Sequence, residues 1–222
     1  MLLKAKRVVV TGANGALGSA VVKAAQAQGA QVHGLDLAFN HPLDGAKTHT
    51  VDLTDAAAVA RVFAAIGDFD VLLNLAGGFA MGEPVADNDA QWDRMFTINV
   101  KTLRTVLKVA VPVLTTRGRG AIVNVGALGA LSGAADMSAY IASKSVVMRL
   151  TESLSSEVRT RGVNVNAVLP SVIDTPQNRQ AMPDADPALW VAPEDLANVI
   201  CFLASDQARA LHGALVPVRG LS

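Results

Sequence analysis

Short apolar runs alternate with longer helical patterns along the chain, and this alternation restricts the fold more than any other feature. The apolar runs are rich in Val, Ile and Leu and have the length of buried strands. They span Arg7–Thr11, Gln31–Asp36, His49–Val51, Val71–Leu75, Gly120–Val125, Asn164–Leu169 and Leu215–Val218. The helical patterns span Ala16–Gln28, Asp55–Ile66, Asp89–Thr116, Ser138–Arg161 and Pro193–Ala204. This order predicts an α/β fold, in which a doubly wound parallel sheet of about seven strands carries helices on both faces.

Composition excludes several classes of protein. Hydrophobic residues make up 51% of the 222 residues, and 19 basic residues balance 19 acidic ones. Disordered chains combine low hydrophobicity with a high net charge, so this composition predicts a folded chain. Because there is no basic excess, no nucleic-acid partner is expected, and no apolar stretch is long enough to span a membrane. The single Cys201 has no disulfide partner, and the four histidines show no metal-ligand spacing. We expect a cytoplasmic protein with one domain, residues 1–222, and no metal.

Three glycines follow the first predicted strand at intervals of three residues. Gly12, Gly15 and Gly18 lie between that strand and a predicted helix, and the turn also contains Asn14, Ala16 and Leu17. Small residues in such a turn let the backbone approach a pyrophosphate, and the helix N-terminus offers N–H groups and a positive dipole end. Because the turn stands between strand and helix, the pattern predicts a dinucleotide-binding site.

The second predicted strand ends at Asp36, 24 residues after Gly12. A carboxylate in this position accepts hydrogen bonds from an adenosine ribose and repels a 2′-phosphate. No Arg or Lys stands in the glycine turn or directly after Asp36. The sequence therefore favours NAD(H) over NADP(H), with the alternative that Asp36 only orders a turn.

Tyr140 and Lys144 stand four residues apart at the start of a predicted helix. Four residues turn a helix by about 400°, so both side chains project from nearly one face. A nearby ammonium favours the phenolate, and we therefore expect Lys144 to lower the pKa of Tyr140. Tyr140 is the only tyrosine of the chain. The pair predicts a proton-transferring site beside the dinucleotide.

These motifs stand in the order typical of the short-chain dehydrogenase/reductase family, which the chain resembles over essentially its whole length. The matching segments are Thr11–Gly18, Asp52-Leu53, Asn74-Leu75-Ala76-Gly77, Asn99, Tyr140-Ile141-Ala142-Ser143-Lys144, Pro170…Thr175 and Pro193-Glu194-Asp195. The resemblance implies a Rossmann-type fold and an NAD(P)-dependent oxidoreductase. It also implies that the two long helices form a bundle between subunits of a homodimer or homotetramer.

The family's roles imply a site at the matching positions. Tyr140 would be the catalytic acid/base, Lys144 its pKa tuner and ribose ligand, and Asn99 a water-relay residue. The cofactor would lie against Tyr140 and Lys144 and against Gly12, Asn14, Gly15, Ala16, Leu17, Gly18, Asp36, Asp52, Leu53, Asn74, Ala76, Gly77, Pro170, Ser171, Val172 and Thr175.

One position departs from the family pattern. The serine that helps to hold a substrate carbonyl usually lies 13 residues before the tyrosine, where this chain has Ala127. Losing such a donor costs on the order of 10²–10³ in rate for a carbonyl substrate. Either Ser132 or Ser138 takes its place, or the substrate does not need the donor, or the enzyme is impaired.

A narrower resemblance suggests why the donor is dispensable. The quinonoid dihydropteridine reductases are similar in the turn Gly15-Ala16-Leu17-Gly18, in the alanine at Ala127 and in the pattern Leu169-Pro170…Asp174-Thr175-Pro176…Asn178-Arg179…Met182-Pro183…Trp190, whereas Asn99 follows the wider family. This resemblance implies hydride transfer from NADH to a small ring imine or carbonyl. The alternatives are a general ketone/aldehyde or 3-oxoacyl reductase and a non-catalytic NAD-binding scaffold.

Residues 174–190 form a polar segment with three prolines and no clear period. We expect this segment to be the substrate loop and to close over the nicotinamide. The residues expected to contact the substrate are Ala127, Arg179, Met182 and Trp190. Arg179 either anchors the substrate or pairs with Asp184 or Asp186, and Trp190 is expected to be a hydrophobic anchor.

Overall fold

The computed structural model describes residues 1–82 and 89–221 and contains a parallel sheet of seven strands in the order β3-β2-β1-β4-β5-β6-β7. The strands are β1 Arg7–Thr11, β2 Gln31–Asp36, β3 Lys47–Thr50, β4 Val71–Asn74, β5 Gly120–Val125, β6 Val163–Pro170 and β7 Leu215–Val218. The fold predicted from the sequence is confirmed. Because the strand order reverses between β1 and β4, a crevice for ligands is expected at the carboxyl ends of these strands.

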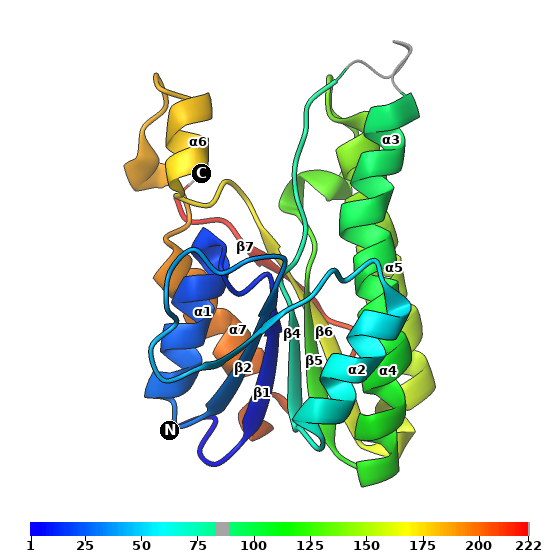
Figure 1. Ribbon diagram of the computed structural model, residues 1–222. Coiled ribbons are helices and arrows are strands. Elements are labelled where there is room, and N and C mark those ends of the chain that lie inside the picture. The colour runs from blue at the N-terminus through cyan, green and yellow to red at the C-terminus, as the bar shows by residue number, and fades with distance from the viewer. Residues whose placement is uncertain (83–88, 222) are drawn as a thin grey trace.

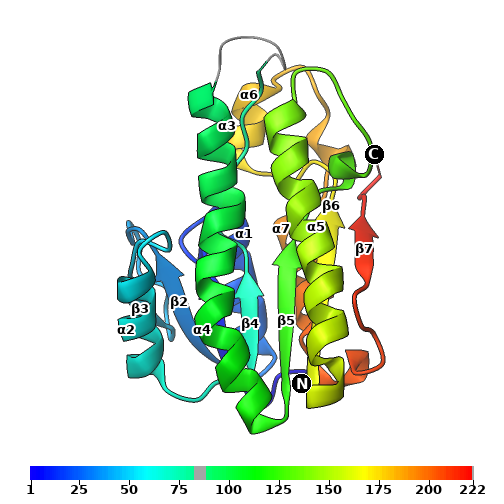
Figure 2. The ribbon, with the colours of Figure 1, turned by 90° about the vertical axis from the view of Figure 1, so that its right-hand side faces the viewer.

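Helices cover both faces of the sheet, as Figure 1 shows. Helices α1 (Ala16–Ala27) and α7 (Pro193–Leu203) lie on one face, and α2 (Ala56–Ile66), α4 (Thr102–Arg117) and α5 (Ser138–Val158) lie on the other. Helix α3 (Asp89–Phe96) precedes α4, and the short α6 (Pro176–Ala181) lies beyond the carboxyl edge of the sheet (Figure 2).

Local signals explain most helix ends. The Asp55 carboxylate accepts hydrogen bonds from the N–H groups of Ala57 and Ala58 and so caps α2, as its sequence position predicts. Gly29 and Gly162 both have positive φ angles, of 89° and 77°, directly after helical segments. A side chain is disfavoured in this conformation, which is why glycine ends helices well.

Three expected elements need correction. Strand β3 begins two residues earlier and ends one residue earlier than the expected His49–Val51. The expected single helix Asp89–Thr116 is interrupted by a π-helical segment at Thr97–Lys101, which local propensity does not reveal. The 174–190 segment contains α6, whose N-terminus is capped by the Thr175 hydroxyl, and a 3₁₀ turn at Pro187–Leu189.

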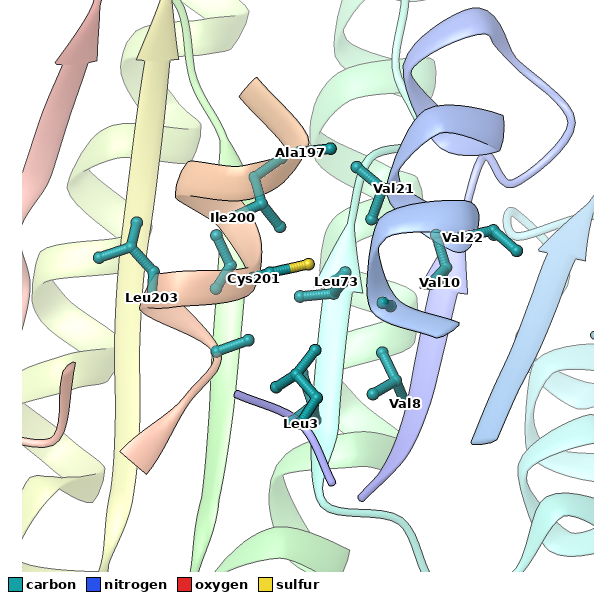
Figure 3. Packing of buried hydrophobic residues seen from close by; sticks show 14 of the residues in the cluster. Leu3, Val8, Val10, Val21, Val22, Leu73, Ala197, Ile200, Cys201 and Leu203 are labelled. Carbon is teal, nitrogen blue, oxygen red and sulfur yellow. The ribbon is translucent and has the colours of Figure 1, made fainter. Parts of the chain in front are cut away.

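The core explains why the strands are continuously apolar. On β1, Val8 and Val10 pack toward α1 and α7, whereas Val9 packs toward the helices of the opposite face, and all three are fully buried. Figure 3 shows the first of these layers, in which Cys201 of α7 lies among apolar side chains. Burial raises the pKa of the Cys201 thiol to about 11, so it is an inert core residue.

Candidate active site

The glycine turn is built so tightly that two of its glycines have no substitute. Gly12 has a φ angle of 67°, and a Cβ atom there would lie 2.8 Å from the backbone nitrogen of Ala76. A Cβ atom at Gly18 would lie 2.0 Å from the carbonyl oxygen of Gly12. The hydroxyl of Thr11 accepts hydrogen bonds from the N–H groups of Leu75 and Ala76, which holds the segment after β4 against the turn.

Gly15 differs from the other two glycines because the protein itself does not require it. Its φ angle of −71° suits any residue, and a Cβ atom there would meet only the carbonyl oxygen of Gly12, at 3.4 Å. It stands at the N-terminus of α1, where no side chain caps the first helical turn. The missing side chain therefore leaves room for a group that approaches the N–H donors of this turn, which fits the pyrophosphate of a dinucleotide.

Asp36 ends β2 beside this turn. Its Oδ2 atom accepts a hydrogen bond of 2.8 Å from the N–H of Asn14, and its Oδ1 atom accepts one of 2.7 Å from the N–H of Leu37. After β3, the Asp52 carboxylate accepts a hydrogen bond from the N–H of Thr54. This hydrogen bond lowers the pKa of Asp52. Leu53 is buried, and its side chain belongs to the hydrophobic core.

A chain of buried amides lies beneath the glycine turn. The Asn74 Nδ2 atom donates to Asn124 Oδ1 at 2.9 Å, and Asn124 Nδ2 donates to the Thr151 hydroxyl at 2.9 Å. A cavity of about 10 Å³ adjoins Asn74, Asn124 and Lys144, which is room for about one water molecule. Sequence reasoning missed Asn124 and Thr151, although Asn124 interrupts an apolar strand and could have been noted for that reason.

The π-helical segment places Asn99 at the centre of the site. Its Oδ1 atom accepts a hydrogen bond from the Gly78 N–H, and its Nδ2 atom donates to the Gly78 carbonyl and to the Ser143 hydroxyl. A Cβ atom at Gly77 would lie 2.7 Å from Asn99 Oδ1 and 3.3 Å from Lys144 Nζ. The Asn99 side chain therefore holds the segment after β4, beside the Lys144 ammonium.

Tyr140 and Lys144 lie in the first turns of α5, as the sequence predicts, but the expected pKa direction is wrong. Burial raises the pKa of Tyr140 to about 12 and lowers that of Lys144 to about 8. The Lys144 Nζ atom donates to the Val125 carbonyl at 2.9 Å. Loss of hydration is thus what sets the pKa of Tyr140 in this arrangement, and Tyr140 is a neutral phenol at neutral pH.

Apolar side chains pack against Tyr140. The ring of Phe79 meets the Tyr140 ring edge to face, with 4.8 Å between the centroids, and Tyr140 packs on a cluster that contains Ala127. Ser132 is exposed, and the Ser138 hydroxyl is buried without a hydrogen-bond partner among the described residues. Sequence reasoning missed Phe79, and its position two residues after Gly77 was the available signal.

The segment after β6 is ordered by its own contacts. Ser171 donates its N–H to the Val218 carbonyl and its hydroxyl to the Arg219 carbonyl, and the N–H of Val191 donates to the Val172 carbonyl. Pro170 ends β6, and Thr175 caps α6. These contacts keep residues 170–175 at the carboxyl edge of the sheet.

Of the two alternatives for Arg179, an ion pair with Asp184 or Asp186 is wrong, because its carboxylate partner is Asp174. Its Nε and Nη2 atoms donate to the two carboxylate oxygens at 2.6 and 2.7 Å; Asp174 directly precedes Thr175, the residue that caps α6. Trp190 is 9% exposed, in agreement with the expected hydrophobic anchor, and Met182 is 36% exposed.

The model of the short chain dehydrogenase family matches residues 6–186. The chain belongs to this family. It is 30% identical to 2-keto-3-deoxy-L-fuconate dehydrogenase of Xanthomonas campestris, over 95% of this chain and 78% of that protein. It is 31% identical to 2-(S)-hydroxypropyl-CoM dehydrogenase 3 of Xanthobacter autotrophicus, over 98% of this chain and 96% of that protein.

Solved structures agree with this family membership. A structure described as an NAD(P)-dependent gluconate 5-dehydrogenase from Beutenbergia cavernae, with bound NADP, superimposes with a TM-score of 0.89 at 29% identity, covering 98% of this chain and 96% of that one. The aldohexose dehydrogenase of Thermoplasma acidophilum, in ligand-free form, gives 0.88 at 27% identity, covering 99% and 94%. The protein is therefore an NAD(P)-dependent oxidoreductase.

Two further observations bear on the site's surroundings. No helix within the described part of the chain is long and apolar enough to cross a membrane. Across residues 1–82 and 89–221, no group of three or more His, Cys, Asp or Glu side chains is placed to hold a metal ion.

Proposed function

We propose that this oxidoreductase transfers hydride between NADH and a small carbonyl or ring-imine substrate, with Tyr140 as the acid/base. The observation that carries the proposal is the position of Tyr140 and Lys144. Both stand in the first turns of α5 at the carboxyl edge of the sheet, and Lys144 lies beside the glycines that Asn99 holds. That edge also carries the glycine turn, so one crevice would bring cofactor and proton donor together.

The chain's own residues account for the proton. NADH supplies the hydride when it is bound. Burial holds the proton on the Tyr140 phenol, which gives it to the oxygen or nitrogen of the reduced substrate. The positive charge of Lys144 then stabilises the phenolate that is left. Asn99 keeps Gly77 and Gly78 in place beside Lys144, and we also assign to it the relay of protons from water.

A matched pair of variants tests the proton donor and separates an enzyme from a non-catalytic NAD-binding scaffold. Tyr140→Phe removes only the hydroxyl, so turnover should fall by at least about 10³-fold while the NADH dissociation constant changes less than about threefold. Tyrosine is absent elsewhere in the chain, so Phe79→Leu, which alters the neighbouring ring, is the control and should retain proton transfer. Equal turnover of wild type and Tyr140→Phe would rule out this acid/base role.

For the cofactor we propose a preference for NAD(H) over NADP(H). The Asn14 N–H and the Leu37 N–H hold the Asp36 carboxylate at the end of β2, where a ribose 2′-phosphate would meet a negative charge. Asp36→Ala should lower the NADH/NADPH ratio of kcat/KM at least about tenfold. Asp44→Ala, which removes one exposed carboxylate elsewhere, should leave the ratio unchanged. A ratio that favours NADPH in the wild type would contradict the preference.

As substrate we propose a small planar ring imine, with quinonoid dihydropterin as the best representative. Ala127 offers no hydroxyl to a substrate carbonyl, and the Phe79 ring gives the Tyr140 side of the site an apolar aromatic wall. The reduction of a neutral quinonoid ring takes one hydride and one proton; the proton from Tyr140 would itself polarise the ring, so no second donor is needed. Residues 174–190, anchored by Trp190, would close over the substrate, with Arg179 and Met182 toward it.

The second candidate is a general ketone, aldehyde or 3-oxoacyl reductase, because the relatives named above are dehydrogenases of sugar derivatives and other small molecules. A panel of NADH oxidation rates decides between them: quinonoid dihydropterin against ketones, aldehydes, a 3-oxoacyl thioester and sugar lactones. The ring-imine proposal expects the highest kcat/KM with the pterin. No oxidation with the pterin, together with turnover of a carbonyl compound, would replace it by the second candidate.

We also propose a homodimer or homotetramer formed through α4 and α5. These helices carry apolar side chains that are only half-buried within one chain, among them Val109, Val113, Val146 and Leu150. Sedimentation velocity of the wild type should give a dimer or tetramer mass, and Leu150→Glu should shift it toward the monomer. A monomer at micromolar concentration would overturn this assembly.

A further inference from the structure

A second cavity opens at the end of the sheet opposite to the glycine turn. This cleft has a volume of about 720 Å³, which is in the range of small-molecule sites. Its walls come from six segments far apart in the sequence: residues 4–7 before and within β1, the start of β2, the turn before β4, the turn between α4 and β5, the start of β6, and residues 204–209 after α7. We call it the basal cleft.

Charge distinguishes the basal cleft from the rest of the molecule. The whole chain has a formal net charge of zero. The cleft is lined by three carboxylates, Asp68, Asp70 and Asp206, and by six cations, namely Lys4, Lys6, Arg7, Arg117, Arg119 and Arg209. This local excess of three positive charges is concentrated in one concave surface, where the field is stronger than on a flat one.

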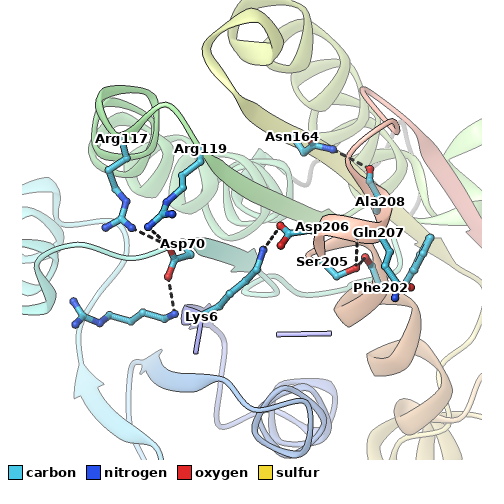
Figure 4. Close-up of polar contacts among 11 residues, drawn as sticks. Lys6, Asp70, Arg117, Arg119, Asn164, Phe202, Ser205, Asp206, Gln207 and Ala208 are labelled. Atoms are coloured by element: carbon cyan, nitrogen blue, oxygen red, sulfur yellow. Dashed lines mark hydrogen bonds and ion pairs between the residues drawn. The ribbon is translucent and has the colours of Figure 1, made fainter. Parts of the chain in front are cut away.

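All three carboxylates are engaged at 3.0 Å or less by two of the six cations, Lys6 and Arg117. Figure 4 shows the contacts of Asp70 and Asp206. Asp206 binds the Lys6 Nζ atom at 2.6 Å. Asp68 and Asp70 bind the two terminal nitrogens of Arg117 at 3.0 and 2.9 Å.

The other four cations make no contact shorter than 3.9 Å with a carboxylate among the described residues. Arg119 reaches Asp70 only at 3.9 Å, and its side chain is 73% exposed. The Arg7 guanidinium donates to the backbone carbonyls of Ile66 and Asp68, which are neutral acceptors. Lys4 and Arg209 are exposed, and within the described residues no carboxylate lies within ion-pair distance of either. An anion that enters the cleft would therefore meet cations that the protein has left uncompensated.

We propose that the basal cleft binds a small polyanion that carries at least two phosphate groups. Guanidinium groups match the oxygens of a phosphate in pairs, and three of the unengaged cations are arginines. The cleft is larger than a single phosphate needs, and its three excess charges are spread over separate segments. A ligand with several linked phosphates bridges these segments, whereas a monovalent anion reaches only one of them.

Inorganic tripolyphosphate is the probe for a calorimetric titration. Saturating NADH is present throughout, because it occupies the glycine turn, the other phosphate-binding element of the chain. The proposal expects saturable binding with one site per chain, and affinity that falls steeply with added salt. The double variant Arg119→Ala/Arg209→Ala should bind at least about tenfold more weakly, and Asp206→Asn, which removes a competing carboxylate, about threefold more tightly.

The matched control is Arg61→Ala, which removes an exposed arginine of α2 outside the cleft and should leave the affinity unchanged. Both cleft arginines are exposed, and a thermal melt of the double variant verifies that it folds. The proposal is overturned if tripolyphosphate shows no saturable binding in the presence of NADH, or if the double variant binds as tightly as Arg61→Ala. Equal affinity for citrate would overturn the assignment to phosphate groups.

Discussion

The two ends of the sheet organise their polar groups in opposite ways. At the carboxyl end, neutral side chains such as Asn74, Asn99 and Asn124 are buried and bind one another or backbone, with Lys144 as a buried cation. At the amino end, polar contacts are made largely by charged groups around an open cleft. The partners of Arg117 and Lys6 there include Asp68 and Asp206, whose side chains are 74% and 89% exposed.

This difference has energetic consequences. A buried amide that loses its partner retains the full cost of desolvation, roughly 1–3 kcal/mol, because water cannot replace the partner. An exposed ion pair contributes about 0–1 kcal/mol, because water and salt screen it. The carboxyl end should therefore be sensitive to single substitutions and suited to holding a defined geometry. The amino end should tolerate substitution and respond to ionic strength.

The largest loss of stability is expected for a substitution of Gly18. Alanine there would place a Cβ atom 2.0 Å from the Gly12 carbonyl oxygen, so α1 or the turn must move, at a cost of about 3 kcal/mol or more. Urea unfolding of Gly18→Ala measures this loss. Gly15→Ala is the control, because its Cβ atom meets only one backbone oxygen at 3.4 Å. It should be almost as stable as the wild type and bind NADH more weakly; equal stabilities of the two variants would contradict the packing argument.

A pair of asparagines compares the two ends directly. Asn124→Ala leaves the amide of Asn74 and the Thr151 hydroxyl without their partner and should lower the free energy of unfolding by about 2–4 kcal/mol. Asn164→Ala at the amino end removes bonds to the carbonyls of Ala208 and Leu211 beside the open cleft, and should cost about 1 kcal/mol. Denaturant midpoints of the two variants show which one loses more stability. A larger loss of stability for Asn164→Ala than for Asn124→Ala would contradict the comparison.

Two neighbouring histidines, His33 of β2 and His49 of β3, show how burial lowers the pKa of a titrating group. His33 Nδ1 lies 3.0 Å from His49 Nε2, a contact that sequence reasoning missed. Burial, followed by the nearby His49, Lys47 and Arg7, holds the pKa of His33 at about 4 instead of 6.5. The unfolded chain therefore takes up the proton first, so stability is complete above about pH 6.5 and is lost as the pH falls toward 4.

His33→Gln removes this titration while keeping a polar group beside His49. Its melting temperature should fall less between pH 7 and pH 4.5 than that of the wild type. His41→Gln, at an exposed position, should fall as the wild type does. Identical acid sensitivity of all three proteins would show that the histidine pair does not govern it.

The smallest change in stability is expected for a substitution of Asp206. Its carboxylate binds Lys6 at 2.6 Å but is 89% exposed, so Asp206→Asn should change the free energy of unfolding by no more than about 0.5–1 kcal/mol. Repeating the urea titration at high salt should remove most of that difference. A loss comparable to that of Asn124→Ala would end the proposed contrast between the two ends.

Sequence patterns predicted the sheet, the glycine turn and the helix bearing Tyr140 because each depends on local signals. The apolar strands, Gly12 with its positive φ and the Asp55 cap are all properties of a few adjacent residues. The π-helical segment at Thr97–Lys101 could not be predicted in this way. It brings Asn99 to Gly78 and Ser143, and contacts over such sequence distances leave no local pattern.

The roles of individual site residues were less predictable for the same reason. The pKa of Tyr140 depends on how much water the folded chain removes, and Phe79 contributes to that from a distant segment. Arg179 lies within seven residues of three aspartates, Asp174, Asp184 and Asp186. Only the folded backbone, in which α6 begins at Pro176, shows that Asp174 is its partner. The basal cleft gathers residues from six segments, none of which shows a local pattern that predicts a site.

The presence of a single tyrosine turns the proposed proton donor into an optical probe. The near-ultraviolet absorbance of phenolate can arise from no residue except Tyr140, so a pH titration of the native protein records one group without labelling. Tyr140→Phe supplies the blank. Added NADH or substrate that reorders water around the ring would change the titration curve, and the chain would thereby report its own ligand occupancy.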